Sequence, residues 1–365
     1  MKKLQRRVEK FKGLSIGLDL HKAFIQVSVL DGHGDEAAAQ RIAADADELG
    51  RLVDRLGEWG MPMRVALEAS GCFVWVYDLL VARLGREAVR VAAPSKVKVI
   101  AEAGEKTDAS DAWWLAYLLQ EGRLPEAFVA EGDLRELRIA CRELRSVTDQ
   151  RSDLMRRLRS HLAQLGVTFA AGAWSSVPGR GKIEALVRQA EAAHGLRGEA
   201  IARLWTRVQA MNEEVEHWDK RMAELSGSLD EVALLDDQLP GVGPMLAAIM
   251  WSELGDPRRY RSAKAYGKAT GLTPGYRESG GRRQAKGMTR QGSAHVRWAL
   301  TRAVVSCRRC KKDPAGLAVK RWVDKMSRRK STKAAIVAAA RKLAEATWRL
   351  FALGEAFDLR RVFPA

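Results

Sequence analysis

The sequence predicts an α/β domain built on a mixed sheet, followed by a mainly helical region that occupies the rest of the chain. Short apolar runs rich in β-branched residues alternate with amphipathic stretches up to about Gly122. Further on, apolar residues recur with heptad spacing, and the last segments carry helix start and stop signals. We place a basic extension at 1–13, the α/β domain at 14–128, a coiled-coil helical region at 129–230 and a mainly α-helical C-terminal domain at 231–365.

The α/β domain is expected to run strand, strand, weak strand, helix, strand, helix, strand, helix. Its strands are predicted at 14–20, 24–30 and 64–67 and in the run AVRVAAP at 88–94, with the weak strand after the DGHGD turn. Amphipathic stretches predict helices at about 47–59, 74–84 and 109–120. This order is typical of a sheet with both parallel and antiparallel neighbours.

Two heptad series define the middle of the chain. Apolar residues occupy most a and d positions from 134 to 165, and a second series holds its register from 201 to 225. The Gly- and Ala-rich stretch 166–181 is expected to link them. The pattern fits an antiparallel coiled-coil hairpin, a dimerising coiled coil, or two ordinary amphipathic helices of a bundle. Further helices are predicted at 294–307 and 332–353, the latter between a Ser/Thr start and a glycine.

Composition excludes several classes of protein. Hydrophobic residues make up 47% of the 365 residues, and no apolar run reaches the ~18 residues of a membrane span. The four cysteines are far fewer than a disulfide-stapled secreted fold needs, so reduced thiols are expected. The basic N-terminus is followed by no apolar stretch, unlike a secretory signal. We therefore expect a cytoplasmic protein with no membrane partner.

The positive charge of the chain is concentrated in one segment. The formal net charge is +17, and residues 251–330 contain 22 basic and 5 acidic side chains, so the rest of the chain is balanced. A field of one sign confined to one region is typical of a surface that binds a polyanion. We favour a nucleic acid as that polyanion over a merely solubilising face, which usually mixes both signs.

Four carboxylates of the α/β domain stand where a metal site can form. Asp19 ends the first strand in GLDLHK, Glu68 ends a later strand in LEAS, and Asp108 and Asp111 begin a helix in KTDASDA. Residues three apart share a helix face, and the ends of neighbouring strands converge. Grouped carboxylates ionise fully only beside cations, and their hard oxygens select Mg²⁺ or Mn²⁺, which can promote phosphodiester cleavage. Taken singly, each acid also has a structural interpretation, with Asp108 as a helix N-cap.

Two glycine-rich stretches of the C-terminal domain are candidate contacts to nucleic acid. In LPGVGPMLA, Gly241 and Gly243 would let backbone N–H groups approach a phosphate. In RESGGRRQAKGMTRQG, Ser279 lies beside two glycines as an accessible nucleophile, or it is only a polar residue of a loop that contacts nucleic acid. The cations expected to bind phosphate there are Arg277, Arg282, Arg283, Lys286 and Arg290.

These pieces, read in order, resemble the DEDD transposases of the insertion sequence 110 family, also known as bridge-RNA-guided recombinases. The matching motifs extend over nearly the full chain and are GLDLHK, LEAS, KTDASDA, LPGVGPMLA, AYGKATGLTP, ESGG and KAAIVAAARKL. The resemblance implies a resolvase-like ribonuclease H fold for the α/β domain, a coiled coil, and a C-terminal transposase domain. It also implies DNA cleavage and rejoining, with the protein associated with the nucleoid when it acts.

The same resemblance implies site residues and partners. Ser279, in its Gly-Gly context, rather than Ser293 in RQGSAH, would attack DNA and form a phosphoserine intermediate. The ligands of Mg²⁺ or Mn²⁺ would be Asp19, Glu68, Asp108 and Asp111. A structured noncoding guide RNA would pair with target and donor DNA. Family members act as tetramers in which the carboxylates of one subunit meet the serine of another, so we expect a homo-oligomer, from dimer to tetramer.

Two other functions stay open at this point. The first is a metal-dependent nuclease or junction resolvase that uses water as its nucleophile and leaves no protein–DNA adduct. The second is a nucleic-acid-binding protein without catalytic activity, in which the four carboxylates are structural. Replacing the acids would abolish cleavage in the first case and change little in the second.

Overall fold

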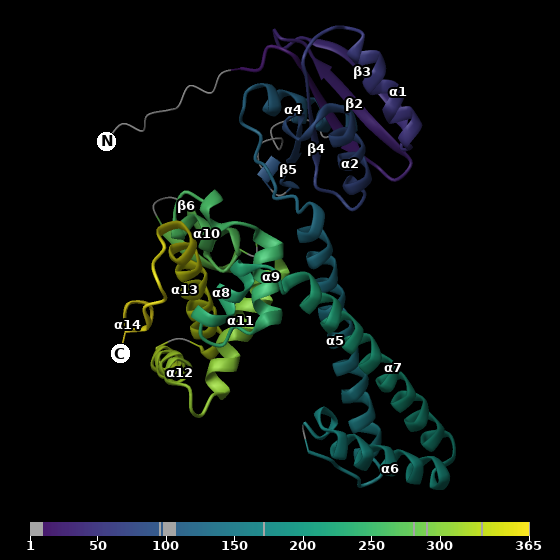
Figure 1. Ribbon diagram of the computed structural model, residues 1–365, viewed down its shortest axis with the longest axis vertical. Helices are drawn as coiled ribbons and strands as arrows, with labels where there is room; N and C mark the ends of the chain where they lie inside the picture. The colour runs from purple at the N-terminus through teal and green to yellow at the C-terminus, as the bar shows by residue number, and fades with distance from the viewer. Residues whose placement is uncertain are drawn as a thin grey trace. The chain divides into compact units, whose positions relative to one another are not determined.

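The computed structural model describes residues 10–94, 96–97, 107–170, 172–279, 282–289, 291–329 and 331–364, and at 175, 276–279 and 282–286 it describes the backbone alone. The chain divides into two compact units, Met1–Val129 and Ala130–Ala365. The first unit contains a sheet covered by helices, and the second is mostly helical (Figure 1). The predicted order of an α/β domain followed by a mainly helical region is therefore confirmed.

Five strands form the sheet of the first unit in the order β3-β2-β1-β4-β5. β1 runs antiparallel to β2 and parallel to β4, and β4 runs parallel to β5, so the sheet is mixed as predicted. Most apolar side chains of β1 and β2 lie on one face of the sheet, while the polar residues Ser15, Gln26 and Ser28 are buried on the other face. These apolar residues are why the two strands could be located from the sequence. The strands are β1 (Leu14–Leu20), β2 (Phe24–Leu30), β3 (Glu36–Ala43), β4 (Met63–Glu68) and β5 (Val89–Ala92).

Helices cover both faces of this sheet. On one face, α1 (Ala46–Gly57) and α2 (Phe73–Leu84) pack against a core that includes Leu18, Val27 and Leu67. On the other face, α4 (Asp108–Gln120) packs against Ala66 and Ala92, and the short helix η1 (Arg86–Ala88) precedes β5. The helices expected at about 47–59, 74–84 and 109–120 are confirmed. The ribonuclease H-like identity of this arrangement stays a prediction.

A helical hairpin begins the second unit. Leu158 of α5 (Gly132–Ala163) packs with Leu204 of α7 (Gly195–Ser226), whereas Leu144 of α5 shares a core with Met222 of α7. The two heptad helices therefore pair antiparallel within one chain (Figure 1). Coiled-coil packing of their side chains stays a prediction.

The segment expected to link the heptad helices contains a helix of its own. After η2 (Ala173–Ser175), the hydroxyl of Ser176 accepts a hydrogen bond from the Gly179 N–H and starts α6 (Val177–Ala193). Gly179 lies against the Ala173 carbonyl, where an added Cβ would come within 1.7 Å of the oxygen. Gly179 is thus needed for close packing at the start of a helix, and the glycine-rich pattern does not mark a simple linker here.

The remaining helices surround a core rich in alanine. Small residues such as Ala299 and Ala303 of α11 and Ala339 of α13 let these helices approach closely. α13 has the bounds predicted for it, between the Ser331 cap and Gly354 at φ 65°. The helices are α8 (Asp230–Gln238), α9 (Pro244–Leu254), η3 (Pro257–Arg259), α10 (Ala263–Ala269), α11 (Ala294–Arg309), α12 (Pro314–Ser327), α13 (Thr332–Leu353) and α14 (Leu359–Val362).

None of the helices in the described ranges combines the length and the apolar character that a membrane crossing requires.

Candidate active site

Two neighbouring parallel strands bring Asp19 and Glu68 to one edge of the sheet. β1 and β4 pair in parallel up to Leu18 and Leu67, so Asp19 and Glu68 are the next residues of the two strands. Neighbouring residues of parallel strands project from the same face, and residues two apart on a strand share a face. Both carboxylates therefore lie on the face of the sheet that carries Gly17.

Helix α4 brings two more carboxylates to this face. Its backbone lies so close to β1 that a Cβ on Gly17 would come within 1.9 Å of the Ala112 carbonyl oxygen. The side chains of Thr107 and Ser110 form a capping box that starts the helix. Thr107 is therefore the N-cap, and the alternative interpretation of Asp108 as the cap is wrong. Asp108 is instead the first helical residue, with Asp111 one turn further on.

The centre of this candidate site consists of Asp19, His21 and Asp108. Nε2 of His21 lies 3.0 Å from Oδ2 of Asp19 and 3.5 Å from Oδ1 of Asp108. Nη2 of Arg41 lies 3.6 Å from the other carboxylate oxygen of Asp108. The His21 ring stacks on Phe24 with 4.4 Å between centroids, which limits its freedom to rotate. The two carboxylates are thus held together through positively charged or proton-donating neighbours.

Asp111 interacts electrostatically with Asp19 of the same candidate site. Burial raises the pKa of the Asp19 carboxyl, while the charge and hydrogen bond of His21 oppose this shift. The negative charges of Asp111 and Asp108 raise the pKa of Asp19 further. The carboxylates of Asp19, Asp108 and Asp111 are therefore close enough to repel one another, and a bound cation would reduce this repulsion.

The residues present fit a divalent metal ion. One ligand atom from each of Asp19, His21 and Asp108 lies within 4.8 Å of the others, and all three residues are half-buried. Carboxylate oxygens with one imidazole nitrogen are donors that divalent cations accept. The site predicted from the sequence does not include His21, although this residue directly follows β1 and lies two positions after Asp19.

Ser279 and most of its basic neighbours lie on a hairpin of the second unit. β6 (Pro274–Ser279) and β7 (Arg282–Met288) pair antiparallel, and Ser279 and Arg282 form the end pair of this ladder. The stretch expected as a loop is therefore mostly strand, with Ser279 as the last residue of β6. The same strands carry Arg277, Arg283 and Lys286, while Arg290 and all these side chains lie outside the described residues.

Ser293, the alternative nucleophile, has a structural role at the start of α11. Its Oγ accepts hydrogen bonds from the N–H groups of His295 and Val296 and donates one of 2.8 Å to Oε2 of Glu253. Glu253 also accepts a 2.7 Å hydrogen bond from Nε of Arg142, and its side chain is only 4% exposed. Burial pushes the pKa of Glu253 upward, but Arg142, together with the Ser293 hydrogen bond and the charge of Arg138, outweighs it and holds this pKa below its usual value.

The turn between α8 and α9 contains the other two glycines selected by sequence. Gly241 has a φ of 71°, and a Cβ there would come within 2.3 Å of the Ala303 carbonyl oxygen on α11. Packing alone therefore requires glycine at this position. A Cβ on Gly243 would meet nothing within 4 Å, and Gly243 is the N-cap of α9.

Family models match both units of the chain. A DEDD model of IS110, described as Transposase, matches residues 16–167, and a model described as Transposase IS116/IS110/IS902 family matches residues 235–318. The first range contains the four selected carboxylates, and the second contains Ser279 and the glycine turn.

Relatives named as transposases align along the chain. A protein of Sinorhizobium fredii (strain NBRC 101917 / NGR234) named as transposase y4pF/y4sB is 25% identical over 355 residues, which cover 94% of this chain and 85% of that protein. The transposase for insertion sequence element IS1328 of Yersinia enterocolitica is 29% identical over 165 residues, or 43% of this chain and 48% of that protein. With both units matched by family models, this chain belongs to the IS110 family of transposases, a class that cleaves DNA and transposes it.

Proposed function

We propose that this transposase cuts and rejoins DNA strands with two sets of residues, one from each unit. Ser279 acts as the nucleophile, and a noncoding guide RNA supplies the sequence specificity for target and donor DNA. Arg277, Arg282 and the neighbouring cations of the hairpin hold phosphates near Ser279. The metal ligands are Asp19, Glu68, Asp108 and Asp111, with Mg²⁺ as the ion and Mn²⁺ as its substitute.

The observation that carries the proposal is the meeting of acidic side chains at one edge of the sheet. Strand register brings Glu68 beside Asp19, and the close approach of α4 brings Asp108 within reach of His21 and Asp19. In chain order the four acids are Asp, Glu, Asp and Asp, the letters in the name of the matching family model. Carboxylates grouped in this way repel one another when they are ionised, and a hard divalent ion bound between them removes that repulsion.

The proposed reaction has two transesterification steps. In the first, Oγ of Ser279 loses its proton to a base and attacks a phosphodiester phosphorus; the P–Oγ bond forms, the P–O bond to one strand end breaks, and that oxygen takes up a proton. In the second, the hydroxyl of a new strand end attacks the phosphoserine, restores Ser279 and completes the joint. Bound Mg²⁺ would supply electrostatic stabilisation of the charge that develops on the phosphate oxygens.

The position of Ser293 supports Ser279 as the nucleophile. The Ser293 hydroxyl is engaged as a helix cap and as a donor to buried Glu253. Attack by this oxygen would require the end of α11 to open. Ser279 instead is the last residue of β6 and precedes two glycines in the sequence.

Adduct formation tests the nucleophile. We expect wild-type protein with Mg²⁺ and its DNA to give a detergent-resistant protein–DNA adduct, and Ser279→Ala to give none. Ser152→Ala, at an exposed position on α5, is the matched control and should behave as wild type. An adduct that persists in Ser279→Ala would disqualify this serine. Cleavage by the wild type with free ends and no adduct would instead identify a nuclease that uses water.

Cleavage assays test the acids. Asp19→Asn should lower the rate of strand cleavage by about 100-fold or more, because it removes a charge that holds the metal, while binding to DNA persists. Asp153→Asn, on the exposed surface of α5, removes one carboxylate charge elsewhere and should leave the rate unchanged. Wild-type cleavage by Asp19→Asn would refute the proposed site.

Bound nucleic acid tests the guide. The protein is expressed with its native flanking noncoding DNA, purified without denaturants, and the RNA that remains bound is sequenced. We expect one discrete RNA that derives from the flank. A heterogeneous mixture of host RNA would contradict guidance and favour direct recognition of DNA. Mass measurement of the same preparation tests the proposed dimer or tetramer.

A further inference from the structure

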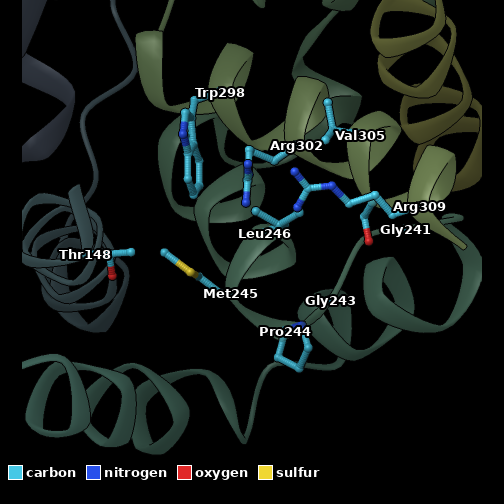
Figure 2. Close-up of a pocket in the computed structure, with 11 residues that line it drawn as sticks. Thr148, Gly241, Gly243, Pro244, Met245, Leu246, Trp298, Arg302, Val305 and Arg309 are labelled. Atoms are coloured by element: carbon cyan, nitrogen blue, oxygen red, sulfur yellow. The ribbon is translucent and has the colours of Figure 1, made fainter. Parts of the chain in front are cut away.

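The second unit contains a groove, and none of the described residues that line it belongs to the β6–β7 hairpin with Ser279. It has a volume of about 430 Å³ and runs between the turn that precedes α9, the first turn of α9, one face of α11, and Thr148 of α5. Figure 2 shows Arg302 and Arg309 on α11 with their side chains extended over Leu246 and toward each other. Trp298 forms the wall on one side of Arg302.

Helical spacing puts the groove residues of α11 on one face. Trp298, Arg302, Val305 and Arg309 are separated by four, three and four residues, the pattern of a single helix stripe. Arg302 and Arg309 are exposed, whereas Trp298 is half-buried. The stripe therefore presents two cations beside an aromatic ring and the apolar side chains of the α9 turn.

The four arginines of α11 fall into two groups. Arg297 donates a 2.7 Å hydrogen bond to the Gly292 carbonyl, and Arg308 pairs with Asp324 at 3.8 Å. Within the described part of the chain, neither Arg302 nor Arg309 has a carboxylate partner, and no acidic residue lines the groove. Two like charges that point into one groove repel each other unless an anion lies between them.

The apolar lining adds a second requirement for the occupant. Met245 and Leu246 of α9 line the groove opposite the arginines, and the guanidinium of Arg302 lies 6.0 Å from the centroid of the Trp298 ring. A small inorganic anion would use the cations but not these surfaces. A phosphate that carries a sugar and base would use both, because bases and sugars pack on aromatic and apolar side chains.

We propose that this groove binds one phosphate of a nucleic acid strand between Arg302 and Arg309, with the adjoining nucleoside against Trp298 and Met245. The inference rests on the proposed function only in that both require this chain to hold nucleic acid strands. DNA and RNA share the phosphodiester chemistry, and the experiment below distinguishes them. The groove positions a strand and takes no part in bond breaking.

Binding of nucleic acid measured without metal ions tests the groove separately from strand cleavage. The full-length wild type, R302A/R309A and the control R188A/R203A are titrated into a labelled single-stranded DNA and an RNA of the same sequence, at several salt concentrations. Arg188 and Arg203 are exposed arginines of α6 and α7, so the control removes the same charge elsewhere. We expect R302A/R309A to bind one or both probes about 10-fold more weakly. The slope of log K against log salt should fall by about 0.7, the value for one phosphate of a single strand.

Chemical protection of the wild type provides a second measurement that no folding defect can affect. Phenylglyoxal modifies accessible arginines, and mass spectrometry of the digested protein gives the extent at each position. Bound probe should protect Arg302 and Arg309 and leave Arg188 and Arg203 reactive. The probe that protects identifies the natural strand as DNA or RNA.

The outcomes separate the two proposals. Binding of R302A/R309A equal to that of R188A/R203A, with no protection of Arg302 or Arg309 by either probe, would overturn the groove and leave the Ser279 adduct test unaffected. Protection and weakened binding, together with an adduct that survives Ser279→Ala, would support the groove and reject the proposed chemistry. The two ideas therefore fail through different measurements.

Discussion

The ion pair between half-exposed Arg142 and buried Glu253 should make the stability of the second unit depend on pH in a defined direction. The carboxylate of Glu253 is 4% exposed and accepts hydrogen bonds of 2.7 and 3.2 Å from Arg142 and of 2.8 Å from Ser293. Arg138 contributes a further hydrogen bond to the backbone carbonyl of Glu253. These contacts join α5, α9 and α11 at one point.

The change Arg142→Ala removes the main partner of this carboxylate. Removing one member of a buried pair typically costs about 3–5 kcal/mol because the remaining charge stays buried. The Arg142 side chain is 48% exposed, so water can reach the space it leaves, and Ser293 continues to donate. We therefore expect a loss of about 2–3 kcal/mol in the free energy of unfolding near pH 7.

The sign of the pH dependence follows from the pKa of Glu253. In the wild type this pKa is lowered, so the stabilisation is present above the unfolded value and is lost as pH falls through the folded value. In Arg142→Ala, burial dominates and raises the pKa of Glu253, so the folded variant favours the neutral acid. The difference in stability between wild type and variant should thus be largest near pH 7 and shrink toward pH 4.

Urea unfolding followed by far-ultraviolet circular dichroism measures this difference, because the helices of the second unit dominate the signal. Arg188→Ala, which removes an exposed partner of Glu184 on α6, is the control and should change stability by less than about 0.5 kcal/mol at either pH. A penalty for Arg142→Ala that stays constant or grows toward pH 4 would refute the reasoning.

Three further changes test how the fold holds the site. Gly17→Ala should abolish cleavage without touching a carboxylate, because its Cβ would meet the Ala112 oxygen at 1.9 Å and displace α4; retained activity in a cleavage assay would contradict this packing. Thr107→Ala should cost about 1 kcal/mol of stability in urea unfolding through loss of the cap, and an unchanged midpoint would argue against the capping box. Gly241→Ala should lower the melting temperature, because φ 71° and the Ala303 carbonyl both exclude a side chain, and a wild-type melting curve would show that the turn relaxes freely.

Local patterns were sufficient for much of the fold. β1, β2 and α13 have the bounds their sequence predicts, because apolar β-branched runs and cap residues act within a few positions of the chain. The same patterns could not place α6 or the β6–β7 hairpin. Gly179 serves close packing in α6, and Gly275 keeps its place in the strand pairing of the hairpin. Both effects depend on neighbours that the local pattern does not contain.

Some features of the candidate site could likewise be predicted from local sequence patterns, and others could not. Local sequence patterns are enough to show which acids end a strand or begin a helix, since strand ends and helix starts are local features. Three features depend on packing between distant segments: Asp108 meets Asp19 through His21, Ser293 serves as a cap bound to Glu253, and Arg302 and Arg309 face one groove. The physical reason is that a carboxylate or guanidinium takes its chemistry from the charges and surfaces around it, which residues far away in the chain supply.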